Sequence, residues 1–173
     1  NGLQSLIDGA TELQQRGRME IKLVLVGDGK MKPDLQRAAK QAQLENLIFH
    51  ELVPKPRLIG LLKSADIGMQ ILANVPAFYY GTSPNKFFDY LVMGLPVLNN
   101  YPGWIADLIS EYRCGFVVQP DNPKAFADAL EEAADNRAEL IKMGNNARVL
   151  AENKFDRKHL ADEFVDWIEG TKF

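Results

Sequence analysis

Apolar residues follow two alternating patterns along the chain. Short continuous apolar runs, typical of strands buried in a parallel sheet, occupy residues 21–26, 46–50, 67–72, 96–98 and 115–118. Apolar residues at helical spacing predict helices at 3–16, 31–43, 58–63, 84–93, 104–111, 125–134, 137–153 and 157–169. Strands that alternate with helices predict an α/β fold: a parallel sheet with helices on both faces, followed by extra C-terminal helices.

The stretch Gly81–Val97, with the sequence GTSPNKFFDYLVMGLPV, carries the main candidate chemistry. Its pattern predicts a loop, a helix, a turn and a strand. Ser83 is a favoured N-cap, Pro84 a favoured first helical residue and Gly94 a favoured stop. A helix N-terminus entered from a loop offers free N–H groups and partial positive charge to a phosphate, and Lys86 adds a full charge.

The two faces of this predicted helix differ. Asp89 shares a polar face with Asn85 and Lys86. The opposite, apolar face consists of Phe87, Phe88, Leu91 and Val92. An anion site with a nearby carboxylate suits a nucleotide diphosphate and its ribose. A capped helix with a Lys86–Asp89 surface pair fits the same residues, so the stretch alone leaves both interpretations open.

Composition narrows the classes of function. A net charge of −3 argues against nucleic acid or an anionic membrane as the main partner. Cys114 is the only cysteine, and the two histidines, His50 and His159, are far apart in sequence. We therefore expect no disulfide, no metal site and a reducing compartment, with Cys114 in the core. The sequence contains neither a signal peptide nor the run of about 20 apolar residues that a membrane helix needs.

Parallel sheets with helices on both faces bind ligands beyond the carboxyl ends of their strands. Four predicted loops leave those ends, at residues 27–30, 50–56, 72–83 and 99–104. The simplest roles for Asp28 and His50 are a turn residue and a strand-end hydrogen bond. We expect Trp104 to pack against other side chains, and Trp167 to be an interface or core anchor.

The segment SPNKFFDYLVMGLPVL resembles the core signature of the group 4-type retaining glycosyltransferases with the GT-B architecture. Four further segments agree with this family in order and spacing: NGLQSLIDGATEL, KLVLVGDG, LENLIFHELVPKPRLIGLLKSADIG and GWIADLISEYRCGFVVQPDNPKAFADAL. The resemblance covers nearly the whole chain. It is nearest to bacterial enzymes of surface-polysaccharide assembly.

The resemblance implies a two-domain enzyme of which residues 1–173 form the second, Rossmann-like domain. This C-terminal domain would bind a nucleotide diphosphate-sugar, most simply a UDP-sugar, and a missing N-terminal domain would bind a glycan or lipid-linked acceptor. The absence of an initiator Met and of a strand before the first helix agrees with a fragment. The expected location is cytoplasmic, with membrane association only through the missing domain. No cofactor or metal is implied, and the isolated domain should be inactive in transfer.

The resemblance also implies roles for individual residues. Asp89 matches the last glutamate of the family's E-x7-E motif, which binds the ribose hydroxyls. Lys86 is the candidate catalytic residue, because it would offset charge on the departing diphosphate. The full set of expected donor contacts is Gly27, Gly29, His50, Val53, Gly81, Thr82, Ser83, Pro84, Asn85, Lys86 and Asp89.

Two positions depart from the family's pattern. Gly81 replaces the first motif glutamate, which contacts the donor sugar, so loop backbone or Tyr80 would have to take that role. The family's Arg/Lys pair on the diphosphate falls near Asn1-Gly2 or upstream of it. Two alternatives therefore remain: half of a sugar-nucleotide epimerase, or a non-catalytic module for nucleotide sensing or partner docking.

Overall fold

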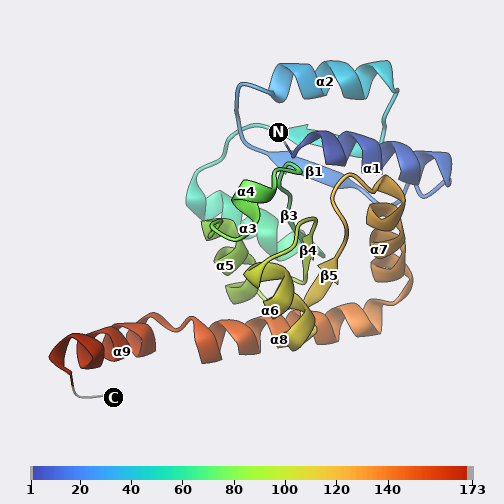
Figure 1. Cartoon of the computed structure of the whole chain (residues 1–173). Coiled ribbons are helices and arrows are strands. Elements are labelled where there is room, and N and C mark those ends of the chain that lie inside the picture. Colours follow the sequence, from blue (N-terminus) through green and yellow to red (C-terminus); the bar gives the residue numbers. More distant parts are fainter. Residues whose placement is uncertain (1, 171–173) are drawn as a thin grey trace.

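The computed structural model describes residues 2–170 (Figure 1). Helices and strands alternate up to the fifth strand, except that two helices lie between the third and fourth strands, and only helices follow the fifth strand in the described residues. The elements are α1 Gln4–Gln15, β1 Leu23–Val26, α2 Lys32–Gln41, β2 Leu47–His50, α3 Lys55–Ser64, β3 Gly68–Gln70, α4 Pro76–Tyr79, α5 Asn85–Val92, β4 Val97–Asn99, α6 Trp104–Tyr112, β5 Gly115–Val117, α7 Pro123–Asp135, α8 Arg137–Lys154 and α9 Arg157–Glu169. The predicted α/β order is confirmed. Asn1, named above for the diphosphate, lies outside the described residues.

All strand pairs among the described residues are parallel, as the alternation of strands and helices predicts. They form two ladders instead of one continuous sheet. One ladder pairs β1 with β2, and the other has the order β3-β4-β5. The two ladders share one core, in which Leu23 of β1 lies in the same cluster as Ile71 and Leu98.

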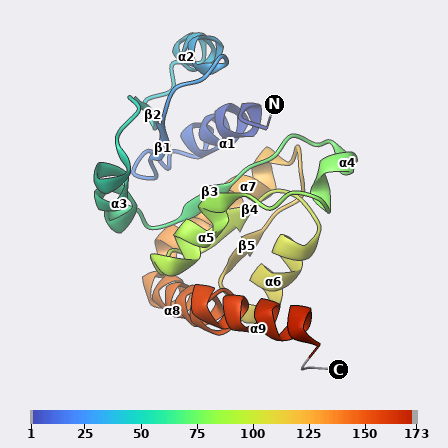
Figure 2. The ribbon, with the colours of Figure 1, turned by 90° about the vertical axis from the view of Figure 1, so that its left-hand side faces the viewer.

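Two hydrophobic cores lie on opposite sides of β3, β4 and β5. The first contains apolar residues of α1, α2 and α7, and the second contains those of α5, α6 and α8. Figure 2 shows α1 above these strands and α8 below them. Cys114 is fully buried in the second core, as expected, and burial raises the pKa of its thiol to about 11.

Three expectations about burial and helix content are wrong. The strand at 21–26 has one open face, because Val24 and Val26 remain 45% and 37% exposed. The loop after β3 contains α4, a helix of four residues that is too short to show a periodic pattern. Val92 is 63% exposed, so the apolar face of α5 is narrower than its sequence suggests.

The last helix, α9, continues beyond α8 and away from the rest of the molecule (Figure 1). It contributes no buried residue. Trp167 is 63% exposed and stacks on Phe164 with ring centroids 6.1 Å apart. A core role for Trp167 is therefore wrong, whereas an interface role stays a prediction. Within residues 2–170, no helix has the length and apolar content to cross a membrane.

Candidate functional site at the carboxyl ends of the strands

The carboxyl ends of β1, β2 and β3 lie at the same edge of the molecule as the start of α1. The Glu45 N–H donates to Gln14 Oε1 (3.3 Å) and Asn46 Nδ2 donates to the Ala10 carbonyl (2.9 Å), so the chain enters β2 along α1 in the direction of the start of that helix. The parallel strand β1 follows the same direction. A Cβ added to Gly2 would lie 2.3 Å from the Leu72 carbonyl carbon, which places the start of α1 against the end of β3.

The ends of β1 and β2 are joined by a lysine that the sequence did not single out. The Gly27 N–H donates to the His50 carbonyl (3.3 Å), and Lys32 Nζ donates to the Gly27 carbonyl (3.0 Å) and the His50 carbonyl (3.3 Å). Lys32 also pairs with Glu51 at 3.2 Å. This ammonium group therefore fixes the turn at Gly27 and the loop that begins after His50 relative to each other.

The side chains of this corner make local contacts. The Asp28 carboxylate accepts from the Gly29 N–H (2.9 Å), which confirms its predicted role in the turn. His50 Nδ1 lies 3.0 Å from the Glu51 carbonyl oxygen, which is the single strand-end contact expected of it. The half-buried Val53 follows in the loop before α3.

The helix α5 begins one residue later than predicted, and Ser83 is not its N-cap. Pro84 occupies that position with extended dihedrals (φ −81°, ψ 129°), and no side chain caps the helix. The Phe87 N–H donates to the Pro84 carbonyl (3.0 Å). Among the described residues, the N–H groups of Asn85 and Lys86 have no acceptor, so both are available to a ligand.

The polar face of α5 carries two side chains without a partner. Lys86 and Asp89 are both exposed, and neither forms an ion pair in the described part of the chain. The Lys86–Asp89 surface pair is therefore absent, and that interpretation of the stretch is wrong. Desolvation by the surrounding protein lowers the pKa of Lys86, although its side chain stays accessible.

The loop before α5 is attached to the start of α6. Trp104 Nε1 donates to the Thr82 carbonyl (3.0 Å), and the Thr82 hydroxyl donates to the Phe78 carbonyl. Gly81 is exposed, and a Cβ added to it would meet no atom within 4 Å. Ser83 and Pro84 thus lie between the Thr82 carbonyl, which Trp104 holds in place, and the uncapped start of α5.

The structure brings the predicted residues together in two groups. Gly27, Gly29, His50 and Val53 surround the ends of β1 and β2, and residues 81–86 with Asp89 form the loop and polar face of α5. No hydrogen bond or ion pair joins the two groups among the residues described. These residues also contain no group of three or more acidic, histidine or cysteine side chains arranged to hold a metal ion.

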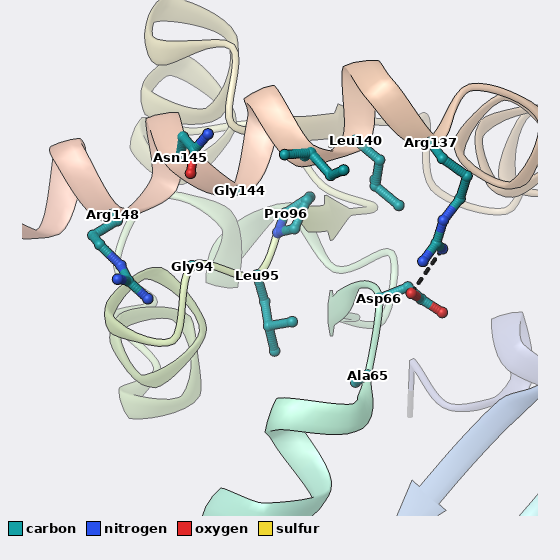
Figure 3. Close-up of a pocket in the computed structure, with 11 residues that line it drawn as sticks. Ala65, Asp66, Gly94, Leu95, Pro96, Arg137, Leu140, Gly144, Asn145 and Arg148 are labelled. Carbon is teal, nitrogen blue, oxygen red and sulfur yellow. Dashed lines mark ion pairs between the residues drawn. The ribbon is translucent and has the colours of Figure 1, made fainter.

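A cavity of about 280 Å³ lies elsewhere, next to the amino-terminal ends of β3 and β4 (Figure 3). It contains two arginines of α8, but each has a structural role. Arg137 pairs with Asp66 at 2.7 Å. The guanidinium group of Arg148 lies beside Gly94 at the C-terminal end of α5, where positive charge is favourable. None of the predicted site residues lines this cavity.

The family model described as "Glycosyl transferases group 1" matches residues 1–136. The chain belongs to this family. Its curated relatives include the O-antigen chain mannosyltransferase C of Escherichia coli, which is 26% identical over 172 residues, or 95% of this chain and 42% of that protein. The D-inositol 3-phosphate glycosyltransferase of Pseudarthrobacter chlorophenolicus is 24% identical over 88% of this chain and 36% of its own length. The chain thus spans less than half of either protein.

Solved structures of other proteins share the fold. Anabaena Alr3699/HepE, in complex with UDP-glucose, matches 98% of this chain and 45% of its own with a TM-score of 0.78 at 18% identity. The C-terminal domain of the Francisella tularensis group 1 protein LpcC matches 90% of this chain and 80% of its own with a TM-score of 0.71 at 19% identity. The chain therefore has the fold of the C-terminal domain of a group 1 glycosyltransferase, as the resemblance implied.

Proposed function

We propose that this chain is the donor-binding domain of a retaining glycosyltransferase and that it binds a nucleotide diphosphate-sugar at the carboxyl ends of its strands. The observation that carries the proposal is the uncapped start of α5. There, two backbone N–H groups, the Lys86 ammonium group and the Asp89 carboxylate all lack protein partners among the described residues. Free donors at a helix N-terminus favour an anion, and a carboxylate one turn later suits two ribose hydroxyls.

The diphosphate would accept hydrogen bonds from the N–H groups of Asn85 and Lys86, next to Ser83 and Pro84. A bound diphosphate would also raise the pKa of Lys86 again, because a nearby negative charge stabilises its ammonium form. The ribose would contact Asp89. The base would rest on the corner formed by Gly27, Gly29 and the segment His50–Val53, which Lys32 fixes in place.

The proposed reaction needs stabilisation of a leaving group more than it needs a nucleophile. In the family that the sequence resembles, the acceptor hydroxyl attacks from the face that the nucleotide leaves, so no covalent enzyme intermediate is required. Negative charge then grows on the departing diphosphate, next to Lys86 and the N–H groups of α5. Preorganised donors at such a position are an effective source of rate enhancement. Lys86 would thus act as the catalytic residue.

UDP-sugars are the favoured donors. The structure of Alr3699/HepE was determined with UDP-glucose, and that of the Staphylococcus aureus protein TarM with UDP. Both proteins share the fold of this chain with TM-scores of 0.78 and 0.79. This structural likeness supports UDP as the first nucleotide to test.

The proposed partner is an acceptor-binding domain of the same enzyme, with residues 1–173 forming one donor-binding domain. Two observations support it. The chain spans 42% and 36% of its curated relatives, and α9 carries an apolar surface with no buried residue. A glycan or lipid-linked acceptor would bind to that domain, which would also provide any membrane association. We place the enzyme in the cytoplasm.

Nucleotide sensing or docking remains the second candidate function because Gly81 lacks the carboxylate that would contact a donor sugar. An epimerase half would use the same nucleotide site. The rivals differ in their reaction: the transferase moves the sugar to an acceptor, the epimerase inverts a centre of the free sugar nucleotide, and the sensor leaves it unchanged. Incubation of the longer enzyme with UDP-sugar and acceptor separates the three.

A titration series tests the donor site. Uridine, UMP and UDP are titrated into the wild-type chain, Asp89→Ala, Lys86→Ala and the control Lys40→Ala, whose lysine lies on α2 away from the site. Loss of a charge-assisted hydrogen bond should weaken binding about 10- to 100-fold. Asp89→Ala should weaken all three ligands, whereas Lys86→Ala should weaken UDP and leave uridine unchanged. A wild-type chain that binds none of the three ligands would overturn the proposal.

A further inference from the structure

The start of α6 contacts both ends of the loop that leads into α5. At one end, a Cβ added to Gly103 would lie 2.8 Å from the Tyr79 carbonyl oxygen, and Gly103 has a φ of +118° that other residues rarely adopt. At the other end, Trp104 Nε1 donates to the Thr82 carbonyl at 3.0 Å. The loop between Tyr79 and Thr82 therefore rests on Gly103, the last residue before α6, and on Trp104, its first residue.

The ring of Trp104 also contacts the first turn of α5. It lies edge-to-face with Phe87 (6.0 Å, 88°) and nearly parallel to Phe88 (6.3 Å, 29°). Phe88 in turn packs against Phe155 at the end of α8 (4.9 Å). One side chain thus contacts the loop through its N–H and the helix through its ring, so it sets the position of one relative to the other.

The remaining contacts of the loop also lead to the strand ends. Tyr79 is buried and stacks on Tyr101, with ring centroids 6.1 Å apart and planes 14° from parallel. Its hydroxyl donates to Asn74, whose side chain donates to Asp121 at 2.7 Å. Among these contacts, Trp104 is the one that reaches α5 itself.

We propose that Trp104 is a positioning residue for the donor diphosphate. Its indole N–H fixes the Thr82 carbonyl, and its ring fixes Phe87 and Phe88, so the N–H groups of Asn85 and Lys86 are held in place before a nucleotide arrives. A loop that is already ordered binds more tightly, because less conformational freedom is lost on binding. This inference rests on the proposed function and assigns to Trp104 the preorganisation of that same site.

The sequence contains a matched control for the experiment. Trp104→Phe keeps an aromatic ring but removes the N–H, and Trp167→Phe makes the same change on the exposed α9. Uridine and UDP are titrated into the wild type and both variants. Loss of one hydrogen bond should weaken UDP binding by Trp104→Phe about 3- to 10-fold. Its uridine binding should not change, and Trp167→Phe should match the wild type with both ligands.

A merely structural Trp104 would give a different result. Equal loss of uridine and UDP, or wild-type affinity for both, would overturn the positioning role. A wild type that binds UDP and is weakened by Asp89→Ala, while Trp104→Phe has no effect, leaves the proposed function intact and removes only this inference. A wild type without any nucleotide binding removes both.

A second measurement needs no variant and covers the case in which Trp104→Phe fails to fold. The two indole N–H signals of the wild type are followed by NMR. We expect the signal of Trp104, hydrogen-bonded to Thr82, to exchange slowly and to shift on addition of UDP but not of uridine. The exposed Trp167 provides the internal reference. A Trp104 signal that exchanges as fast as that of Trp167, or that ignores UDP, would contradict the proposal.

Discussion

A side chain at position 81 would meet no neighbour. A Cβ built on Gly81 has no atom within 4 Å, and the residue is exposed. Gly103 is different, because a Cβ there would press on the Tyr79 carbonyl oxygen. The backbone therefore requires glycine at 103 but not at 81. Steric hindrance does not exclude the glutamate of the family motif from position 81.

Gly81→Glu should consequently be tolerated and should strengthen recognition of a donor sugar. A carboxylate within reach of a sugar hydroxyl adds a charge-assisted hydrogen bond, so affinity for UDP-glucose should rise about 10-fold while affinity for UDP itself stays the same. Calorimetric titration of both ligands measures this difference. Gly60→Glu, in equally open space on α3, serves as the control. Equal changes for UDP and UDP-glucose would show that the new carboxylate does not reach the sugar.

Single residues also show why the long-range contacts of the site could not be predicted from the sequence. Lys32 bonds to the His50 carbonyl across 18 positions, and Trp104 bonds to the Thr82 carbonyl across 22. Hydrophobic spacing and local motifs report neighbours within a helix or strand, but not a side chain that reaches a distant carbonyl. The sequence could therefore propose which segments form the site, but not how they are held together.

At the scale of elements, local rules predicted the boundaries well wherever the chemistry is local. Gly94, with a φ of +68°, lies just after α5 as predicted. The start of α7 is also set locally, because the Asn122 side chain accepts from the Ala125 N–H (3.0 Å). The predicted start of α5 was wrong because Pro84 has extended dihedrals instead of the helical ones expected of it. Whether a strand face is covered also depends on where helices pack, which is why the open face of β1 was missed.

Two helical glycines allow a matched test of packing within an element. Alanine is preferred to glycine in a helix by about 1 kcal/mol, so propensity alone predicts that Gly9→Ala and Gly60→Ala are both stabilising. A Cβ on Gly9, however, would lie 2.4 Å from the Phe126 ring, which joins α1 to α7, whereas one on Gly60 meets nothing within 4 Å. Overpacking should make Gly9→Ala destabilising by about 1–3 kcal/mol.

Urea unfolding of the two variants measures this difference. Gly60→Ala should raise the free energy of unfolding by about 0.5–1 kcal/mol and so raise the urea midpoint. Gly9→Ala should lower both. Both substitutions have the same effect on the unfolded chain, so a difference in sign arises from the folded state. Equal stabilisation of both variants would mean that α1 and α7 can separate without cost.

At the scale of the whole molecule, the residues that stabilise the fold and those of the proposed donor site lie in different parts. The two cores on either side of β3–β5 hold the fold together, and the proposed donor site lies at one edge of it. The helix α9 belongs to neither. Its exposed apolar side chains are Leu160, Phe164, Val165, Trp167 and Ile168. An exposed apolar surface of this kind lowers the solubility of the folded chain and adds no residue to its core. Such a surface is typical of an interface with another part of a protein.

Removal of residues 157–173 should therefore leave the stability of this chain nearly unchanged. The described part of α9 buries no residue, so we expect the melting temperature to move by less than about 2 °C, whereas Leu150→Ala in the neighbouring α8 should cost about 2–5 kcal/mol. The truncated chain should also bind less of a hydrophobic dye. If α9 packs on an acceptor domain, the same deletion lowers the melting temperature of the longer enzyme. A large loss of stability in the present chain would show instead that α9 supports the donor-binding fold directly.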